Sequence, residues 1–128
     1  MVLFKLILIA HGLADFVVQS KAIVESKEKL EFRGFFIHIT TVFLFTFLLT
    51  SFYGFKLAII VSCLVAVAHF CVDFFKALLA RFSKNPMNLS LFFIDQILHI
   101  LIIYFISLRF EFLYFTSDIL SYVLVFIY

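Results

Sequence analysis

The sequence predicts an all-α integral membrane protein, a polytopic bundle of four transmembrane helices. Of its 128 residues, 66% are hydrophobic and 14% are charged, and the mean hydropathy is +1.22. A soluble domain is closer to half apolar and a quarter charged, so this chain has too little polar surface to cover itself in water. The apolar residues fall into stretches near the roughly 20 residues that cross a hydrocarbon core. Gly and Pro are scarce in these stretches, which favours unbroken helices.

The chain is expected to be a single membrane domain, 1–128. A charged linker, Ser20–Arg33, follows the first apolar stretch, and its part Glu25–Arg33 is expected to lie on the membrane surface as a solvated amphipathic segment. The apolar tail, 110–128, favours a short fifth helix, with an interfacial or partner-docking helix as the alternative. The four main helices are expected at residues 2–19, 34–52, 56–80 and 88–108.

The distribution of Lys and Arg predicts the orientation. Seven of these ten residues lie in or beside the linkers 20–33 and 81–88, and three lie on the opposite side. By the positive-inside rule both linkers are cytoplasmic and the N-terminus is outside, in a bacterial cytoplasmic membrane. The formal net charge of +2 is too small to indicate nucleic acid as a partner. The expected partner is the lipid bilayer, and the tail is the expected contact for a second copy or another membrane protein.

One heptapeptide occurs twice. Residues 10–16 read AHGLADF and residues 68–74 read AHFCVDF, so each copy carries a histidine and, four residues later, an aspartate. On a helix, residues i and i+4 lie on the same face. A third pair in the reverse order is Asp95 with His99, and His38 stands alone. On the predicted topology all these residues lie in the cytoplasmic halves of the helices and converge at one depth.

The repeated heptapeptide also suggests an internal duplication. The first two helices would correspond to the third and fourth, with His38 matching His99. The match is imperfect, because Gly34 stands four residues before His38 where the second half has Asp95.

Ionisable residues inside a membrane cost a few kcal/mol each and need mutual compensation. A divalent cation provides it, because imidazole and carboxylate are its ligands; the donor set suits zinc first, with manganese or iron as alternatives. Seven candidates exceed one tetrahedral site, so either two ions bind or some carboxylates orient the histidines. Hydrogen-bonded pairs that only hold helices together, and a proton relay without metal, are the competing interpretations. The candidate metal ligands are His11, Asp15, His38, His69, Asp73, Asp95 and His99.

Other polar residues near these positions are candidates for substrate binding. Gln19 extends the face of Asp15, and Gln96 adjoins Asp95. Lys76 lies three residues after Asp73, near the expected cytoplasmic mouth; it either binds substrate or reaches a lipid phosphate. The two cysteines lack metal-site spacing and are interpreted as packing residues.

Five spaced segments resemble a known family. They are HGLADFVVQ, Lys27 eight residues after Gln19, His38, HFCVDFFK and FIDQILH. Together they closely resemble the domain-of-unknown-function family 3307, an uncharacterised bacterial membrane family, over nearly the whole chain as far as the fourth helix. The resemblance supports the topology and the site but implies no established reaction. More distantly, the layout looks like small membrane proteins described as metal-dependent hydrolases.

The leading functional hypothesis is metal-dependent hydrolysis of an amphipathic or lipid-like substrate. A bound metal lowers the pKa of its water, and Asp95, Asp15 or Asp73 would take the proton as the catalytic base. Whether the protein is an enzyme stays open. The alternatives are a small carrier or channel subunit for divalent cations or protons, and a non-catalytic assembly partner. A site confined to one side favours the enzyme, since a transport path should continue to the other face.

Overall fold

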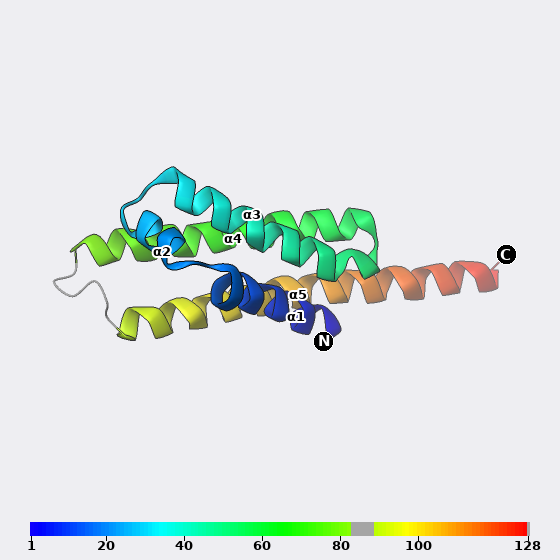
Figure 1. Ribbon diagram of the computed structural model, residues 1–128. Helices are drawn as coiled ribbons and strands as arrows, with labels where there is room; N and C mark the ends of the chain where they lie inside the picture. Colours follow the sequence, from blue (N-terminus) through cyan, green and yellow to red (C-terminus); the bar gives the residue numbers. More distant parts are fainter. Residues whose placement is uncertain (83–88, 128) are drawn as a thin grey trace.

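The computed structural model describes residues 1–82 and 89–127, with side chains described for 1–82 and 90–113. This part of the chain is helical apart from short turns, which confirms the predicted all-α class (Figure 1). Its elements are α1 (Val2–Gly12), the π-helix η1 (Leu13–Val18), α2 (Lys21–Glu28), α3 (Phe32–Thr50), the 3-10 helix η2 (Ser51–Tyr53), α4 (Phe55–Phe82) and α5 (Leu89–Ile127).

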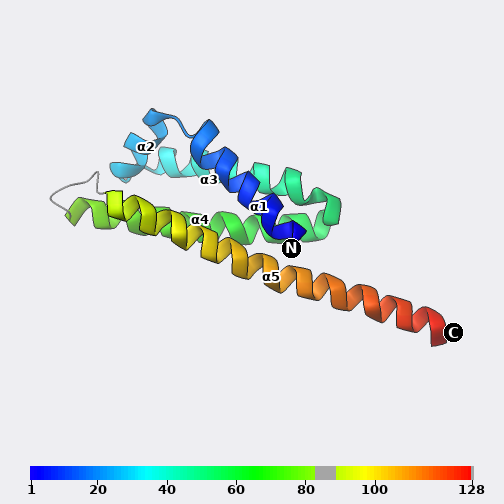
Figure 2. The same ribbon diagram turned by 90° about the horizontal axis from the view of Figure 1, so that it is seen from below.

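Four helices form a ring. α1 packs on α3 and α5, and α4 packs on the same two helices, so α1 and α4 lie diagonally across the bundle. The short α2 lies at one end and contacts α3 and α4 (Figure 1). The C-terminal part of α5 extends beyond the other helices (Figure 2).

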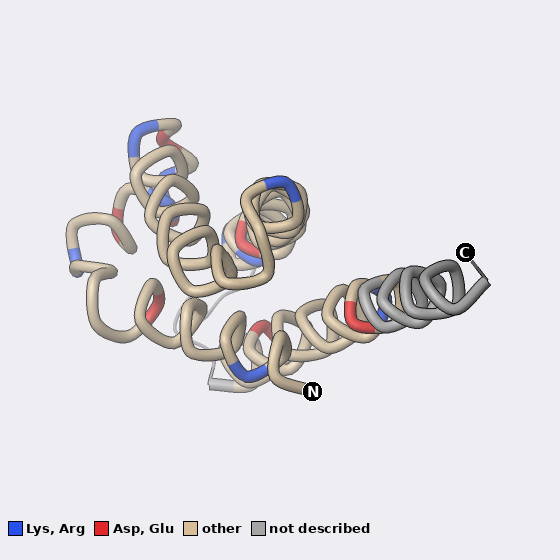
Figure 3. The backbone as a smooth tube through the Cα atoms, turned by 90° about the vertical axis from the view of Figure 1, so that its right-hand side faces the viewer, with Lys and Arg blue, Asp and Glu red and all other residues tan. Residues whose placement is uncertain are grey.

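Three helices are long and apolar enough to cross a membrane: Phe32–Tyr53, Phe55–Phe82 and Ser90–Leu113. A fourth span is counted when Val2–Val18 and Lys21–Glu28 are taken together, although they are bent by 96°. Charged residues are few and scattered along the backbone, most of which carries other residues (Figure 3). Length and composition thus support an integral membrane protein with three or four spans.

The first helix, expected to be unbroken over 2–19, is continuous over Val2–Val18, but its second part is irregular. The α-helix gives way to π-helix at Leu13, and the chain leaves helical geometry at Gln19, whose ψ is 104°. Ser20 then starts a new helix, because its hydroxyl accepts a hydrogen bond from the backbone N–H of Ile23 at 3.4 Å. A serine N-cap placed directly after an extended residue lets the chain turn sharply into α2.

Most residues of the linker Ser20–Arg33 are exposed and none is buried, which agrees with a solvated segment, but the linker also packs against the bundle. It contains α2, which rests on α3 where Gly34 is buried. A Cβ atom at Gly34 would lie 2.7 Å from both Cβ and Oγ of Ser26, so glycine allows this close approach. Leu30, with φ of 60°, ends α2 in the left-handed conformation and returns the chain towards α3.

The tail does not form a separate fifth helix. Residues 110–127 continue α5, because no Gly or Pro interrupts the sequence from Leu89 to Ile127. Glu111 on this helix accepts a hydrogen bond from the backbone N–H of Leu3 at 2.7 Å, which satisfies a free donor at the start of α1. The predicted boundary at 108 is therefore wrong. Residues 83–88, in the expected cytoplasmic linker 81–88, and residue 128 lie outside the described residues.

The bundle interior has an apolar layer next to a polar one. The apolar layer takes residues from every helix of the ring: Leu3, Ile7, Ala14, Val42, Val61, Val65 and Ile103. Each histidine lies four residues from one of them in sequence: His11 from Ile7, His38 from Val42, His69 from Val65 and His99 from Ile103. One helical turn separates such pairs, so the histidines form the next layer on the same inward faces.

Candidate metal centre

The four histidines meet inside the bundle, although each comes from a different helix. All four are at most 3% exposed. His69 is central, since its ring centroid lies 4.1 Å from that of His99, 4.9 Å from that of His38 and 5.3 Å from that of His11. The rings of His11 and His99 stack at 5.0 Å. The ring of helices therefore gathers residues up to 88 positions apart into one cluster.

Asp15 lies among three of these rings. Its Oδ1 atom is 3.4 Å from Nε2 of His38 and 3.4 Å from Nε2 of His69, and 3.6 Å from Nδ1 of His11. Despite these neighbours, Oδ1 of Asp15 has no hydrogen-bond partner among the described residues, and neither has Nδ1 of His11. Asp15 belongs to the π-helix, an element frequently found at functional sites.

Asp73 borders the same pair of histidines. Nε2 of His38 and Nε2 of His69 are 2.8 Å apart, and Oδ2 of Asp73 lies 3.4 Å from the first and 3.8 Å from the second. Oδ2 also accepts a hydrogen bond from Nζ of Lys27 at 2.5 Å. The Lys27 side chain is 12% exposed and that of Asp73 is 5% exposed, so the ion pair is largely shielded beneath α2.

Sequence reasoning did not include Lys27 among the site residues. Lys27 was noted for its spacing from Gln19, but the linker that carries it was expected to be solvated. The turn that brings α2 back over the bundle involves Gln19, Ser20 and Gly34. These three residues form no hydrophobic repeat in the sequence from which the turn could be predicted. One signal was available in the sequence. Asp73 has a single cation one turn away on its own helix, Lys76, so a second cation from another segment was possible.

Asp95 and its neighbours form the other end of the cluster. Lys76 donates to Oδ2 of Asp95 at 2.7 Å, and the amide of Gln96 donates to the same oxygen at 3.2 Å. Oε1 of Gln96 lies 3.4 Å from Nε2 of His11. Nδ1 of His99 lies 3.5 Å from Oδ1 of Asp95, an oxygen without a hydrogen-bond partner. Thus two of the three expected substrate-binding residues contact the cluster.

Gln19 is the third of them. It ends the π-helix, and its backbone N–H donates to the carbonyl oxygen of Ala14 at 3.1 Å. The side-chain nitrogen is buried and has no hydrogen-bond partner within the described part of the chain. No described contact joins this side chain to the His/Asp cluster, so its expected role in substrate binding stays a prediction.

Three overlapping groups of side chains could each hold a metal ion. They are His11 with Asp15 and His69, then His38 with His69 and Asp73, and finally Asp73 with Asp95 and His99. Within each group the potential ligand atoms lie within 4.8 Å of one another. The groups share His69 and Asp73, and together they contain all seven candidate ligands. We refer to these seven residues as the His/Asp cluster.

The fold and the cluster define a class: an integral membrane helical protein with buried His/Asp groups able to hold a metal ion. Within that class, the chain belongs to the family described as Protein of unknown function (DUF3307), whose family model matches residues 2–126. The match includes most of α5, beyond the five segments that carry the resemblance. Searches of curated proteins and of solved structures give no match.

Proposed function

We propose that this protein binds a divalent metal ion in the His/Asp cluster and uses it to hydrolyse an amphipathic substrate. The observation that carries the proposal is the surroundings of Asp15. One buried carboxylate oxygen has three imidazole nitrogens at 3.4–3.6 Å and no hydrogen bond to any of them. A buried oxygen without a partner is unfavourable, and an ion shared with the imidazoles would satisfy it.

The three separations measured from Asp15 are close to those of a zinc coordination shell. Zinc bonds to histidine nitrogen and carboxylate oxygen are about 2.0–2.2 Å long, so neighbouring ligands of a regular tetrahedron are about 3.4 Å apart. Two of the separations from Asp15 Oδ1 are 3.4 Å and the third is 3.6 Å. The separation of 2.8 Å between His38 and His69 is that of a hydrogen bond between two imidazoles, so these rings would have to move apart to bind the same ion.

The charges of the cluster favour one ion beside Asp15. Lys27 pairs with Asp73 and Lys76 pairs with Asp95. In the described part of the chain, Asp15 has ion-pair contacts only with histidines, which are neutral when they act as ligands. We therefore assign His11, Asp15, His38 and His69 to the ion. Asp73, Asp95 and His99 surround it and orient its ligands.

A divalent ion at this position supplies Lewis acidity and a water of lowered pKa. Asp73 is the residue we assign as proton acceptor, because Lys27 holds Oδ2 while Oδ1 keeps no lysine partner. In the reaction, water loses a proton to Asp73 and its oxygen bonds to the acyl or phosphoryl centre. The bond to the leaving alcohol then breaks, and that alcohol takes the proton back. The apolar layer above the cluster excludes bulk water from the other side.

Metal analysis of protein purified without chelator tests the proposal. We expect a stoichiometric divalent ion in the wild type and loss of it in Asp15→Asn, which keeps the side-chain shape but removes the charge. The matched control is Ser62→Ala on α4, which removes a buried hydroxyl that has no hydrogen-bond partner. A folded wild type without metal would contradict the proposal.

Proton transfer is the second candidate function, and one observation favours it. His38 and His69 lie at hydrogen-bond distance from each other, with Asp15 and Asp73 alongside. Such a series of titratable groups is typical of proton relays in membranes. The apolar layer formed by residues such as Ile7, Val42 and Val65 opposes continuation of this path across the membrane. Proton uptake by metal-free protein in vesicles distinguishes this function from hydrolysis.

A further inference from the structure

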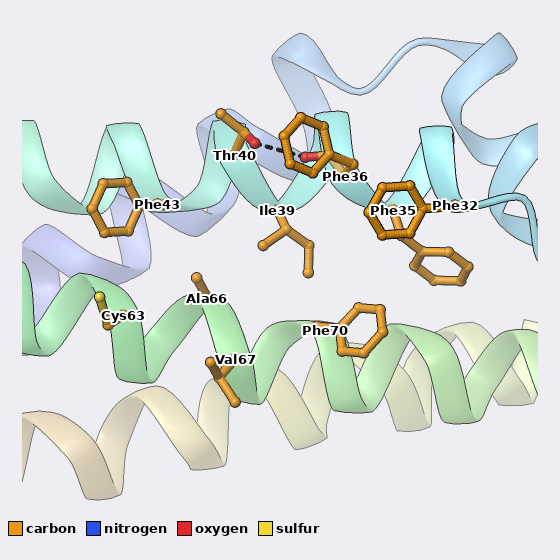
Figure 4. A pocket seen from close by; sticks show the side chains of 10 residues that line it. All are labelled: Phe32, Phe35, Phe36, Ile39, Thr40, Phe43, Cys63, Ala66, Val67 and Phe70. Atoms are coloured by element: carbon orange, nitrogen blue, oxygen red, sulfur yellow. Dashed lines mark hydrogen bonds between the residues drawn. The ribbon is translucent and has the colours of Figure 1, made fainter.

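Two grooves lie on opposite sides of α4, and only one of them reaches the His/Asp cluster. The groove between α3 and α4 has a volume of about 450 Å³ and is lined by apolar side chains such as Phe36, Phe43 and Phe70 (Figure 4). Its only hydroxyl, on Thr40, donates to the backbone oxygen of Phe36 at 2.8 Å. This groove offers nothing to a polar group.

The groove between α4 and α5, about 250 Å³ in volume, is different. Apolar residues such as Leu79, Leu91 and Leu98 line it, but so do Lys76 and Asp95. We call it the α4/α5 groove. Asp95 is 3% exposed and contacts Gln96 and His99, so the groove adjoins the His/Asp cluster through this one residue. An apolar wall with a charged pair at the inner side suits an amphipathic molecule.

Lys76 has donors to spare in this groove. Its ammonium group has three N–H donors, and the described contacts assign one of them to Asp95. Nζ also lies 5.6 Å from the ring centroid of Phe92, and the side chain is 38% exposed. A charged group exposed beside apolar side chains of membrane-spanning helices needs a polar partner. A phosphate oxygen accepts such donors strongly.

From this charge pattern we propose that the α4/α5 groove binds an anionic phospholipid, with its phosphate on Lys76 and its acyl chains against the apolar wall. The inference rests on the proposed function, because it names the substrate class of the same centre. Three carboxylates, two lysines and one divalent ion leave a single positive charge when the imidazoles are neutral. The loaded centre therefore attracts an anion, whereas the unloaded centre, with one net negative charge, repels it.

The two cysteines allow a direct test, since Cys71 lines the α4/α5 groove and Cys63 lines the α3/α4 groove. Zinc-loaded protein in neutral detergent micelles is mixed with phosphatidic acid or with phosphatidylcholine of the same acyl chains. Labelling of each cysteine by N-ethylmaleimide is followed by mass spectrometry. We expect phosphatidic acid to slow labelling of Cys71 more than phosphatidylcholine does, and both lipids to affect Cys63 equally.

Variants separate charge from packing. Lys76→Gln should weaken the protection of Cys71 by phosphatidic acid about tenfold, as expected for the loss of a hydrogen bond between charged groups. Lys76→Arg should retain protection, and Lys56→Gln, at the other end of α4, should leave it unchanged. Equal protection by the two lipids in the wild type would overturn the inference without any variant.

Metal content is measured in the same samples. This measurement distinguishes failure of the lipid inference from failure of the proposed function. Wild-type protein that holds metal but does not distinguish the lipids overturns the inference and leaves the proposed function standing. Folded wild-type protein that holds no metal overturns the proposed function. Chelator treatment of loaded protein should abolish the preference for phosphatidic acid, because the positive charge of the centre is removed.

Discussion

Lys27 on α2 and Asp73 on α4 form an ion pair with 2.5 Å between Nζ and Oδ2, although 46 positions separate them in sequence. The Asp73 side chain is 5% exposed and the Lys27 side chain 12% exposed, so water compensates little of either charge. The pair ties the short helix at one end of the bundle to the His/Asp cluster. It also makes the position of α2 part of the electrostatics of the candidate metal centre.

Lys27→Met should destabilise the protein by about 3 kcal/mol, because it leaves a buried carboxylate without its cation. Unfolding by sodium dodecyl sulfate in mixed micelles measures the free energy. The control is Lys29→Met on the exposed side of the same segment, which should change little. Adding Asp73→Asn to Lys27→Met should recover much of the lost stability. Equal destabilisation by Lys27→Met and Lys29→Met would contradict the role of the ion pair.

Gly34→Ala should destabilise the protein although alanine is the better helix former. The new Cβ atom would meet Ser26 at 2.7 Å, and overpacking of this kind costs about 1–3 kcal/mol. Gly12→Ala is the matched control, since its Cβ atom would have nothing within 4 Å and should stabilise the helix by about 0.5–1 kcal/mol. Ser26→Gly should partly rescue Gly34→Ala. Thermal unfolding in detergent reports all four proteins.

His69→Ala should lose bound metal while the protein still inserts into the membrane. His69 belongs to two of the three potential metal groups, and replacing it by alanine makes α4 more apolar. Metal content per protein and the yield of membrane-inserted protein are the two measurements. Hydrogen bonds within membranes are worth about 0.6 kcal/mol on average. If His69 only makes such hydrogen bonds, His69→Ala should hardly change the stability of the protein. Retention of metal would remove His69 from the centre.

The orientation predicted from Lys and Arg can be tested at two exposed lysines in a variant without Cys63 and Cys71. Lys29→Cys should react with an impermeant maleimide only in inside-out vesicles, and Lys56→Cys only in intact cells. These reactivities follow from a cytoplasmic α2 and an external connection between α3 and α4. The reverse pattern would invert the protein in the membrane and place the candidate centre near the outer face.

Much of the helical architecture was predictable because each long helix carries its own hydrophobic signal. The helices predicted at 34–52 and 56–80 agree with α3 and α4 to within a few residues. The recurrence of His and Asp at helical spacing likewise singled out seven residues that the fold brings together. Their roles as ligands and the internal duplication stay predictions. The first copy of the heptapeptide includes π-helix, whereas the second lies in the regular α4.

The sequence by itself determined a membrane helical class and the inward helix faces that carry the cluster, since both depend on hydropathy and on residues three or four positions apart. Only the tertiary structure decided the 96° bend before α2, the burial of Lys27 and the pairing of Lys76 with Asp95. These features depend on contacts between distant segments, such as Ser26 against Gly34. A local pattern records which face of a helix is polar, but the partner on that face is set by how neighbouring helices pack.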